Sequence, residues 1–323
     1  MYAFGPIPSR RLGQSLGINN IPPKHCTYSC VYCQVGRTDS LMIERREFYK
    51  PQHVFGAVES RIEQVQQRGG HIDYLSFVPD GEPTLDINLG EEINLLKSLG
   101  YKIAVFTNAA LIWQEDVRND LLLADQVSLK VDTICESNWR EINRPYGRLR
   151  QELILQGIME FVNEFTGTLT TETMLVSGLN DNLEILKYTA DFISHLHPDI
   201  SYISIPTRPP AENWVEIPST DAINLAYQIF KSNLNSVEML HTEVEENFGF
   251  TGNAEDDLLQ TAAVQPLTER AIEELLANNH ERWSLVHRLI AQKKLREVFF
   301  QGRRFYIRQF PKKGEYEESN LFN

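Results

Sequence analysis

The sequence predicts an α/β protein in which a partial (β/α)6 TIM-like barrel precedes a C-terminal winged helix-turn-helix domain. Short apolar runs alternate with helical patterns along most of the chain, as they do in proteins with a parallel sheet. No glycine-rich dinucleotide loop follows the first expected strand, which favours an incomplete barrel over a doubly wound open sheet. The polar motifs come directly after expected strands, and barrels carry their chemistry at the carboxyl ends of the strands.

Six segments are expected to form strands because they are nearly continuous in apolar residues, as strands buried on both faces are. These are residues 14–19, 74–78, 102–107, 126–131, 168–176 and 200–205. Helices fit the gaps between them, since apolar side chains recur there at helical spacing. The expected helices lie within residues 54–65, 91–99, 155–162, 183–196 and 220–234. Gly100 is a predicted C-cap, and Ser219 is a predicted N-cap.

Three regions follow from the composition along the chain. Residues 1–248 are expected to form the barrel, 249–265 an acidic linker, and 266–323 a basic winged-helix domain. Within the last region, two amphipathic helices are expected at residues 267–279 and 282–292. Two strands, 295–300 and 305–307, flank a predicted hairpin turn at Gln301–Gly302.

The overall composition is that of an ordinary globular chain. It has 323 residues, of which 42% are hydrophobic and 23% charged, and this excludes a mainly disordered or collagen-like protein. No apolar run approaches about 18 residues, so no membrane span is expected. The first residues lack the basic and then apolar layout of a signal peptide, and we expect a cytoplasmic monomer.

The charge is unevenly distributed. A net charge of −13 argues against a protein that binds nucleic acid over its whole surface. Residues 282–313, however, contain ten Lys and Arg and the single acid Glu297, so this segment carries +9. Such a basic tail predicts a polyanionic partner, with tRNA or another nucleic acid expected. The alternative is that the tail docks on the protein's own acidic residues, which are Glu243, Glu245, Glu246, Glu255, Asp256 and Asp257.

Three of the four cysteines, Cys26, Cys30 and Cys33, lie within eight residues, which indicates a metal site rather than a disulfide framework. Thiolates gathered in a loop suit zinc or an iron–sulfur cluster. Zinc would need a fourth ligand, whereas His25 adjoins Cys26 and Cys135 is distant in sequence. A [4Fe–4S] cluster held by three cysteines would instead leave one iron open to a substrate or cofactor.

The spacing C-x3-C-x2-C after the first expected strand resembles the signature of the radical S-adenosylmethionine superfamily. The resemblance implies that the open iron binds the amino and carboxylate groups of S-adenosylmethionine. An electron then cleaves the sulfonium, and the resulting 5′-deoxyadenosyl radical abstracts a substrate hydrogen. It also implies an electron donor such as flavodoxin or ferredoxin. Tyr32 resembles the aromatic residue that the family places against the adenine, the alternative being a packing residue of the loop.

A second motif, Asp80-Gly81-Glu82-Pro83, resembles the family's GGEP segment, although aspartate stands where the first glycine is usual. The resemblance implies that Gly81, Glu82 and Pro83 receive the methionyl ammonium of S-adenosylmethionine through a carboxylate and backbone carbonyls. Without the cysteine motif, a turn would be the ordinary interpretation.

A third motif, Thr107-Asn108, resembles the family's threonine–asparagine–glycine, with Ala109 in place of the glycine; a strand-ending turn is the alternative. Ser128, Lys130 and Asp132 alternate along one expected strand and so share a face. We expect them to contact the ribose of S-adenosylmethionine or the substrate, or else to form a hydrogen-bonded core layer.

Two further segments offer candidate side chains. Arg208 can fork onto a carboxylate of methionine or of the substrate, and Glu212 is a candidate substrate contact, although a Pro-Pro turn is the alternative. Cys135 follows the strand that carries Lys130, and these two are the catalytic candidates. Cys135 would be a hydrogen donor to a product radical or a covalent acceptor, the alternative being an ordinary free thiol.

The resemblance narrows to one subgroup over roughly residues 1–240. Gly5–Gly13, Leu16–Asn19, Ile142–Pro145 and the Arg-Pro-Pro-Ala-Glu run resemble Fe–S oxidoreductases that are similar to the tRNA wyosine-synthesis enzymes. Those enzymes carry a second cysteine set, and this chain has only Cys135 to spare, so their particular reaction is not supported.

Three functions follow from these observations. The first is a radical enzyme that modifies RNA, with tRNA the expected substrate held by the basic domain. The second keeps the radical chemistry and assigns it a peptide or protein substrate. The third is a non-catalytic iron–sulfur regulator that binds DNA, and the Glu82 motif disfavours it because a sensor needs no S-adenosylmethionine pocket.

Overall fold

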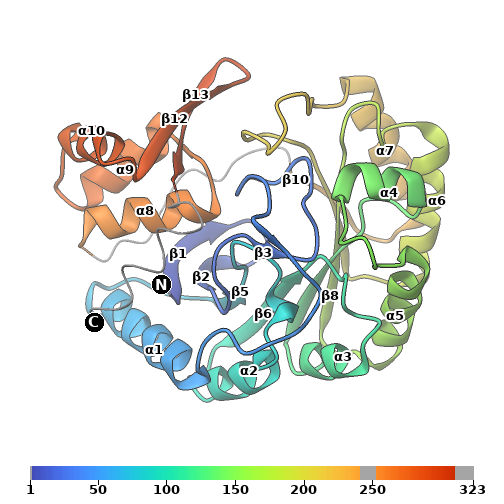
Figure 1. Ribbon diagram of the computed structural model, residues 1–323, viewed down its shortest axis with the longest axis horizontal. Helices are drawn as coiled ribbons and strands as arrows, with labels where there is room; N and C mark the ends of the chain where they lie inside the picture. The colour runs from blue at the N-terminus through green and yellow to red at the C-terminus, as the bar shows by residue number, and fades with distance from the viewer. Residues whose placement is uncertain (1, 241–251, 310–323) are drawn as a thin grey trace.

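The computed structural model of the protein describes residues 2–240 and 252–309. Its main element is a curved eight-stranded sheet with the order β1-β2-β5-β6-β7-β8-β9-β10 (Figure 1). The first pair, β1 (Ala3–Ser9) and β2 (Gly13–Ile18), is antiparallel, and every later pair is parallel. The remaining strands are β5 (Tyr74–Phe77), β6 (Lys102–Thr107), β7 (Gln126–Lys130), β8 (Thr168–Met174), β9 (Ile200–Ser204) and β10 (Val237–Leu240).

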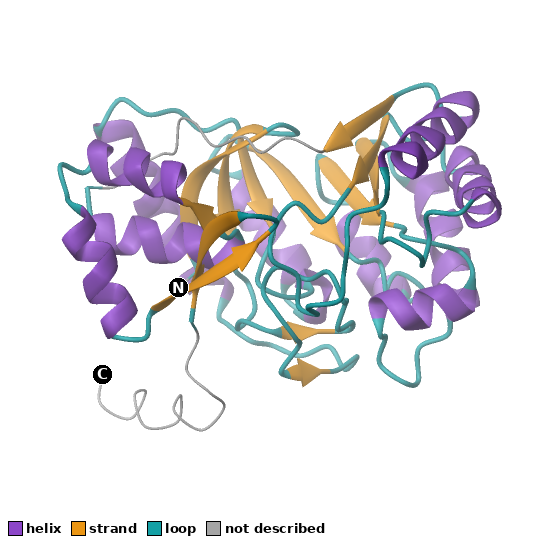
Figure 2. Ribbon diagram, turned by 90° about the horizontal axis from the view of Figure 1, so that it is seen from above, coloured by secondary structure: helices purple, strands orange, loops and turns teal. Residues whose placement is uncertain are grey.

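Helices line the outside of this sheet (Figure 1), and Figure 2 shows the strands fanning out between helices. They are α1 (Pro51–Gln67), α2 (Leu89–Lys97), α3 (Glu115–Leu121), α4 (Glu136–Asn143), α5 (Gln151–Glu164), α6 (Leu183–His195) and α7 (Thr220–Asn233). Because parallel strands joined by helices all run the same way, their carboxyl ends meet at one edge of the sheet. No helix in the described ranges is both long and apolar enough to cross a membrane.

The apolar core lies between the sheet and these helices. Leu16, Leu75 and Ile103 are register partners in three neighbouring strands, and each is fully buried. Val127 continues the core in β7. Burial of such side chains contributes about 1.5–3 kcal/mol each, so the continuous apolar runs specify the sheet.

The predicted α/β barrel fold is confirmed, with eight strands rather than six. The six expected strands correspond to β2 and to β5 through β9, with ends that differ by at most two residues. The sequence did not indicate β1 because Pro6 and Pro8 interrupt it, and its register shifts between Phe4 and Ile7. It also did not indicate β10, which has only four residues, of which only Val237 is fully buried.

Residues 252–309 form a second unit, which we call the C-terminal module. It contains α8 (Ala254–Val264), α9 (Glu269–Asn278) and α10 (Trp283–Ala291), with an antiparallel sheet of β11 (Leu267–Thr268), β13 (Arg303–Arg308) and β12 (Leu295–Phe300). The hairpin β12–β13 turns at Gln301 and Gly302, whose φ angles of 51° and 74° suit a two-residue turn. The module has a core of its own, which includes Leu258, Ile272 and Leu289.

The segment expected to be a linker, residues 249–265, instead forms helix α8 over Ala254–Val264, while residues 249–251 lie outside the described ranges. Asn253 caps this helix by accepting a hydrogen bond from the Asp256 backbone N–H at 3.2 Å. Three acidic residues then occupy the first turn, where the helix dipole favours negative charge. The acidic residues that indicated a linker therefore mark the N-terminus of a helix.

Helix α8 also attaches the module to the barrel. Arg61 of α1 is only 7% exposed, and its Nε donates to the Gly5 carbonyl at 2.8 Å. The same guanidinium reaches Gln260 Oε1 at 2.8 Å and Asp257 Oδ1 at 3.4 Å, both on α8. A buried arginine bonded to both units thus holds them in one orientation.

The first prediction concerns Glu92, which lies in the first turn of α2 and is 1% exposed. Burial raises the pKa of Glu92 to about 10, and the nearby Asp86 adds to this rise. Because the pKa is higher in the folded state, stability falls as the pH rises from the unfolded value towards 10. Glu92→Gln should therefore stabilise the protein at pH 8, by up to about 5 kcal/mol, but not below pH 4.

Thermal denaturation of both proteins across this pH range measures the effect. Glu91→Gln, at an exposed neighbouring position, is the matched control and should show no pH-dependent gain. A gain for Glu92→Gln of equal size at pH 4 and pH 8 would contradict a titrating carboxyl group.

Candidate active site

The three clustered cysteines occupy one loop that begins in the short strand β3 (His25–Cys26), which pairs with β4 (Ser40–Leu41). A tight turn, in which the Cys33 backbone N–H donates to the Cys30 carbonyl at 3.1 Å, brings the later two together. Burial raises the pKa of all three thiols, that of Cys30 to about 12. For Cys26 and Cys30, a nearby carboxylate and the other thiolates add to this rise. Such thiols need positive charge to be deprotonated together, and iron in a cluster supplies it.

Two amides donate to the sulfurs. Asn108 Nδ2 lies 3.5 Å from Cys26 Sγ, and Asn143 Nδ2 lies 3.4 Å from Cys30 Sγ. Hydrogen bonds to sulfur are among the factors that set the potential of iron–sulfur clusters, so this donor set fits a [4Fe–4S] cluster. Within residues 2–240 and 252–309, no group of three or more His, Cys, Asp or Glu side chains is arranged to hold a single metal ion.

His25, considered above as a zinc ligand, contacts Pro23 and Phe48 instead. Its Nδ1 lies 3.1 Å from the Pro23 carbonyl, and its ring packs edge-on against Phe48 with a centroid distance of 5.5 Å. Three thiols therefore remain the evident donor set of this loop.

The Asp80–Pro83 segment lies directly against the start of the cysteine loop. The Lys24 backbone N–H donates to the Asp80 carbonyl at 2.6 Å, and the Glu82 N–H donates to the His25 carbonyl at 3.0 Å. A Cβ atom on Gly81 would lie 2.0 Å from the His25 carbonyl oxygen, so only glycine fits there. The structure thus brings the first two sequence motifs together through their backbones.

The Glu82 carboxylate links the third motif to the second. It is 1% exposed and accepts hydrogen bonds from Thr84 Oγ1 and Thr107 Oγ1, each at 2.7 Å, and from the Asn108 N–H at 2.8 Å. Burial raises the pKa of Glu82, and these hydrogen bonds oppose the rise. Oε1 accepts hydrogen bonds from both hydroxyls, whereas Oε2 accepts one, from the Asn108 N–H. Oε2 therefore has more capacity to accept a further hydrogen bond.

Ala109, where the family's motif has glycine, adopts φ = 60° and is buried. A non-glycine residue in this region costs roughly 1 kcal/mol or more. Two hydrogen bonds hold the turn: Ala109 N–H to Thr107 Oγ1 and Ala110 N–H to Asn108 Oδ1, each at 3.0 Å. Ala109 therefore adopts the left-handed backbone conformation that glycine would favour at this position.

Tyr32 is oriented by a buried carboxylate at the end of β7. Its hydroxyl donates to Asp132, which also accepts from Asn143 Nδ2 at 2.7 Å and from the Met174 N–H at 2.8 Å. Lys130 Nζ lies 5.1 Å from the centre of the Tyr32 ring and 3.8 Å from Asp132. The Tyr32 ring is thus fixed beside the cysteine loop.

A second network of charges crosses the barrel interior. Glu172 accepts from Lys130 Nζ at 2.7 Å, from Arg11 at 2.6 Å and from Ser204 Oγ at 2.9 Å. Burial raises the pKa of Glu172, but the two cations outweigh it, and this pKa lies below its usual range. Ser128 is buried and precedes Lys130 by two residues on β7, so it lies on the same face.

Sequence reasoning missed Arg11 and Glu172. The only available signal was a single acid within the β8 sequence TLTTETM, while Arg11 lies 161 residues away. The Arg11 guanidinium also covers the rings of Phe106 and Tyr202, at 4.5 and 5.5 Å from their centroids.

A cavity of about 200 Å³, which we call the inner cavity, opens at the mouth of the barrel. Arg11, Glu172, Ser204, Gln34 and Arg208 are among the residues that line it. Arg208 Nη1 lies 3.4 Å from Gln34 Oε1, so the predicted Arg208 reaches the residue directly after Cys33. The inner cavity combines both signs of charge beside the cysteine loop, as a site for a polar substrate would.

Glu212, the candidate substrate contact, is paired with two arginines. Its carboxylate accepts two hydrogen bonds from Arg37, each at 2.8 Å, and another from Arg144, and these arginines lower the pKa of Glu212. The Glu212 N–H also donates to the Val31 carbonyl at 3.0 Å. Glu212 thus ties the cysteine loop to the end of α4.

Cys135 lies at the N-terminal end of α4, where its N–H donates to Thr133 Oγ1 at 3.1 Å. It lines neither the inner cavity nor the larger cavity described below. Its expected catalytic role stays a prediction.

Comparison with known proteins agrees with this site. The model of the family described as the radical SAM superfamily matches residues 20–192. The UPF0026 protein MJ1312 of Methanocaldococcus jannaschii is 44% identical over 308 residues, which cover 95% of each chain. A UPF0026 protein of Synechocystis is 35% identical and covers 64% of this chain and 76% of its own.

A solved structure supports the fold. The radical SAM methyltransferase from Sphaerobacter thermophilus has a TM-score of 0.54 at 14% identity and covers 71% of this chain and 67% of its own. At such identity the likeness shows the fold alone. From the family match and the 44% identical relative, the chain belongs to the radical SAM superfamily, which implies a [4Fe–4S] cluster and S-adenosylmethionine as cofactors, and it groups with the UPF0026 proteins.

Proposed function

We propose that this radical SAM enzyme holds a [4Fe–4S] cluster through Cys26, Cys30 and Cys33 and modifies RNA, with tRNA the expected substrate. One observation carries the proposal: the basic hairpin β12–β13 stands against the segment that follows β9, beside the cysteine loop (Figure 1). Gln301 Nε2 at its tip lies 3.5 Å from the Pro206 carbonyl. An element suited to a polyanion is therefore a neighbour of the site of chemistry.

When bound, the cluster and S-adenosylmethionine supply reductive cleavage of the sulfonium and abstraction of a substrate hydrogen. We assign the Glu82 carboxylate, with the Gly81 and Pro83 backbone, to the methionyl ammonium. Thr107 and Asn108 position that carboxylate. The Tyr32 ring, oriented by Asp132, is assigned to the adenine.

The other candidates keep their expected roles within this proposal. Ser128 and Lys130 share one face of β7 and are assigned to the ribose or to the substrate. Arg208 is assigned to a carboxylate, and its place on the inner cavity supports this. Lys130 and Cys135 are the residues we propose for proton or hydrogen transfer, and a flavodoxin or ferredoxin is the proposed reductant.

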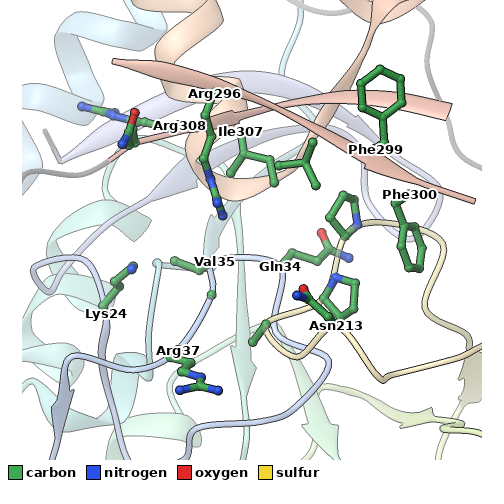
Figure 3. A pocket seen from close by; sticks show the side chains of 16 residues that line it. Lys24, Gln34, Val35, Arg37, Asn213, Arg296, Phe299, Phe300, Ile307 and Arg308 are labelled. Atoms are coloured by element: carbon green, nitrogen blue, oxygen red, sulfur yellow. The ribbon is translucent and has the colours of Figure 1, made fainter. Parts of the chain in front are cut away.

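Some of the basic residues expected to bind RNA form ion pairs within the protein, and others line a cavity beside the cysteine loop. Arg288 and Lys294 pair with Glu255 of α8, so for these two the alternative of docking on the protein's own acidic residues applies. Arg304 lies 3.3 Å from Glu269, which was not among those acids. Arg296 instead points from β12 towards the cysteine loop (Figure 3), whereas Arg308 donates to the Leu259 carbonyl of α8 at 3.3 Å. Lys312 and Lys313, and the acidic Glu243, Glu245 and Glu246, lie outside the described residues.

The order of elements in the C-terminal module, helix, short strand, two helices and hairpin, supports the winged-helix interpretation of residues 266–323, with α8 as an added first helix. The fold also resembles that in a structure titled as TYW1 with a lysine-pyruvate adduct bound, with a TM-score of 0.51, 16% identity, and coverage of 69% and 76%. Because only Cys135 remains outside the cysteine loop, we do not extend that protein's chemistry to this chain.

The second prediction tests the chemistry. Protein reconstituted without oxygen and given dithionite should release 5′-deoxyadenosine from S-adenosylmethionine, measured by liquid chromatography. Cys30→Ala should release none, because a cluster with two protein ligands would not be held. Activity in that variant would refute the ligand assignment, and tight DNA binding without any cleavage by the wild type would favour the regulator.

Mass spectrometry of tRNA nucleosides tests the substrate class. Cells with and without the gene should differ in one modified nucleoside. An unchanged nucleoside profile, together with S-adenosylmethionine cleavage that a peptide stimulates, would favour a peptide or protein substrate.

The third prediction concerns Gly81. Gly81→Ala should sharply lower the iron and sulfide content of the reconstituted protein, because its Cβ would push the Glu82 segment away from His25. Gly56→Ala, on the exposed side of α1 with nothing within 4 Å of the added atom, is the control. It should keep full iron content and gain up to about 1 kcal/mol of stability. Equal iron content in both variants would contradict the role of this contact.

A further inference from the structure

A larger cavity of about 520 Å³, which we call the outer cavity, lies between the cysteine loop and the hairpin β12–β13 (Figure 3). The cysteine-loop side contributes Lys24, Gln34 and Arg37, and the hairpin contributes Arg296 and Arg308. Residues 209–211 and 213 form another wall. The volume lies within the usual range of small-molecule pockets.

The lining of the outer cavity is cationic. Lys24, Arg37, Arg296 and Arg308 line it, and none of the 16 described residues around it is Asp or Glu. Arg37 is already bonded to Glu212 and Lys24 lies 3.8 Å from Asp39, so part of this charge is compensated. In Figure 3 the Arg296 side chain points from β12 into the cavity. A concave, positively charged lining concentrates anions.

An aromatic ring accompanies this charge. Arg296, Val298 and Phe300 alternate along β12 and so share one face, which is the face towards the cavity. Figure 3 shows Phe300 pointing towards the 209–213 wall, whereas Phe299 points away on the other side of the strand. Guanidinium groups with an aromatic ring are the combination that binds the phosphates and unstacked bases of single-stranded nucleic acid.

The two cavities share one lining residue, Gln34. This residue directly follows Cys33, and its side chain contacts Arg208 of the inner cavity at 3.4 Å. A flexible chain with its phosphates in the outer cavity can therefore place its next base in the inner cavity, beside Arg11 and Glu172.

From these observations we infer that the outer cavity binds an unpaired segment of RNA, which continues past Gln34 into the inner cavity. This inference rests on the proposed function and specifies how its substrate is held. Double-stranded RNA does not fit, because a cavity walled on opposite sides admits single nucleotides rather than a helix. Arg288, the one arginine of α10, is paired with Glu255 at 3.1 Å and does not line the outer cavity.

The fourth prediction uses the full-length reconstituted protein and a short fluorescent RNA, either single-stranded or annealed to its complement. Fluorescence anisotropy over a series of KCl concentrations should show tighter binding of the single strand. Arg296→Ala should weaken it and reduce the slope of log affinity against log salt by about 0.7, since one phosphate contact is lost. Phe300→Ala should weaken it by roughly 5- to 100-fold without changing that slope.

Matched controls remove the same groups outside the cavity. Arg288→Ala loses one positive charge on α10, and Tyr188→Ala loses a ring that is 52% exposed on α6 and lines neither cavity. Both should bind the single strand as the wild type does. Arg296→Lys should restore most of the salt slope, and unchanged thermal melting should show that each variant is folded.

The outcomes separate this inference from the proposed function. Equal losses in the controls, or tighter binding of the duplex, overturn the inference even if tRNA nucleosides and S-adenosylmethionine cleavage behave as proposed. Absence of binding to either RNA overturns it as well. Binding through Arg296 and Phe300 without any S-adenosylmethionine cleavage would leave the inference standing and overturn the proposed function.

Discussion

The site depends on one close backbone contact, between Gly81–Glu82 and the strand that carries His25 and Cys26. The Glu82 N–H donates to the His25 carbonyl, and no side chain fits at Gly81. From there the connections are continuous, because the Glu82 carboxylate holds the Asn108 backbone and the Asn108 amide reaches Cys26 Sγ. The Gly81–Glu82 segment, Asn108 and the strand of Cys26 thus position one another. A displacement of Gly81 would directly displace the strand that begins the cysteine loop.

The charges in the barrel are buried in compensated sets. Glu172 lies between Lys130 and Arg11, and Asp132 accepts hydrogen bonds from Tyr32, Asn143 and a backbone N–H. Removing one partner of such a set leaves an uncompensated buried charge and costs about 3–5 kcal/mol. The side chains around the inner cavity are therefore fixed before any ligand arrives, as a site that controls a reactive intermediate requires.

How much the sequence predicts depends on how local the signal is. Strands β5 to β9 and the cysteine loop follow from short runs and short spacings, so both were predicted nearly residue by residue. The pairing of Arg11 with Glu172 spans 161 residues and leaves no local pattern. Glu212 illustrates a different limit. The sequence motif that contains it was recognised, but its partner Arg37 is 175 residues away. Only the folded structure shows that Glu212 holds the cysteine loop in place. Likewise, the acids of α8 indicate either a linker or a capped helix until its buried Leu258 is placed.

The net charge of −13 and the proposed binding of a polyanion are compatible because the local field, and not the total, acts on a ligand. At physiological ionic strength charges are screened beyond about 8 Å, so acids on the far side of the barrel contribute little at the hairpin. Helix α8 contributes in another way, since Glu255 binds Arg288 and Lys294 on the outer side of the module. Arg296 of β12, in contrast, points into the outer cavity. The positively charged lining of the outer cavity thus adjoins the loop that carries the three cysteines.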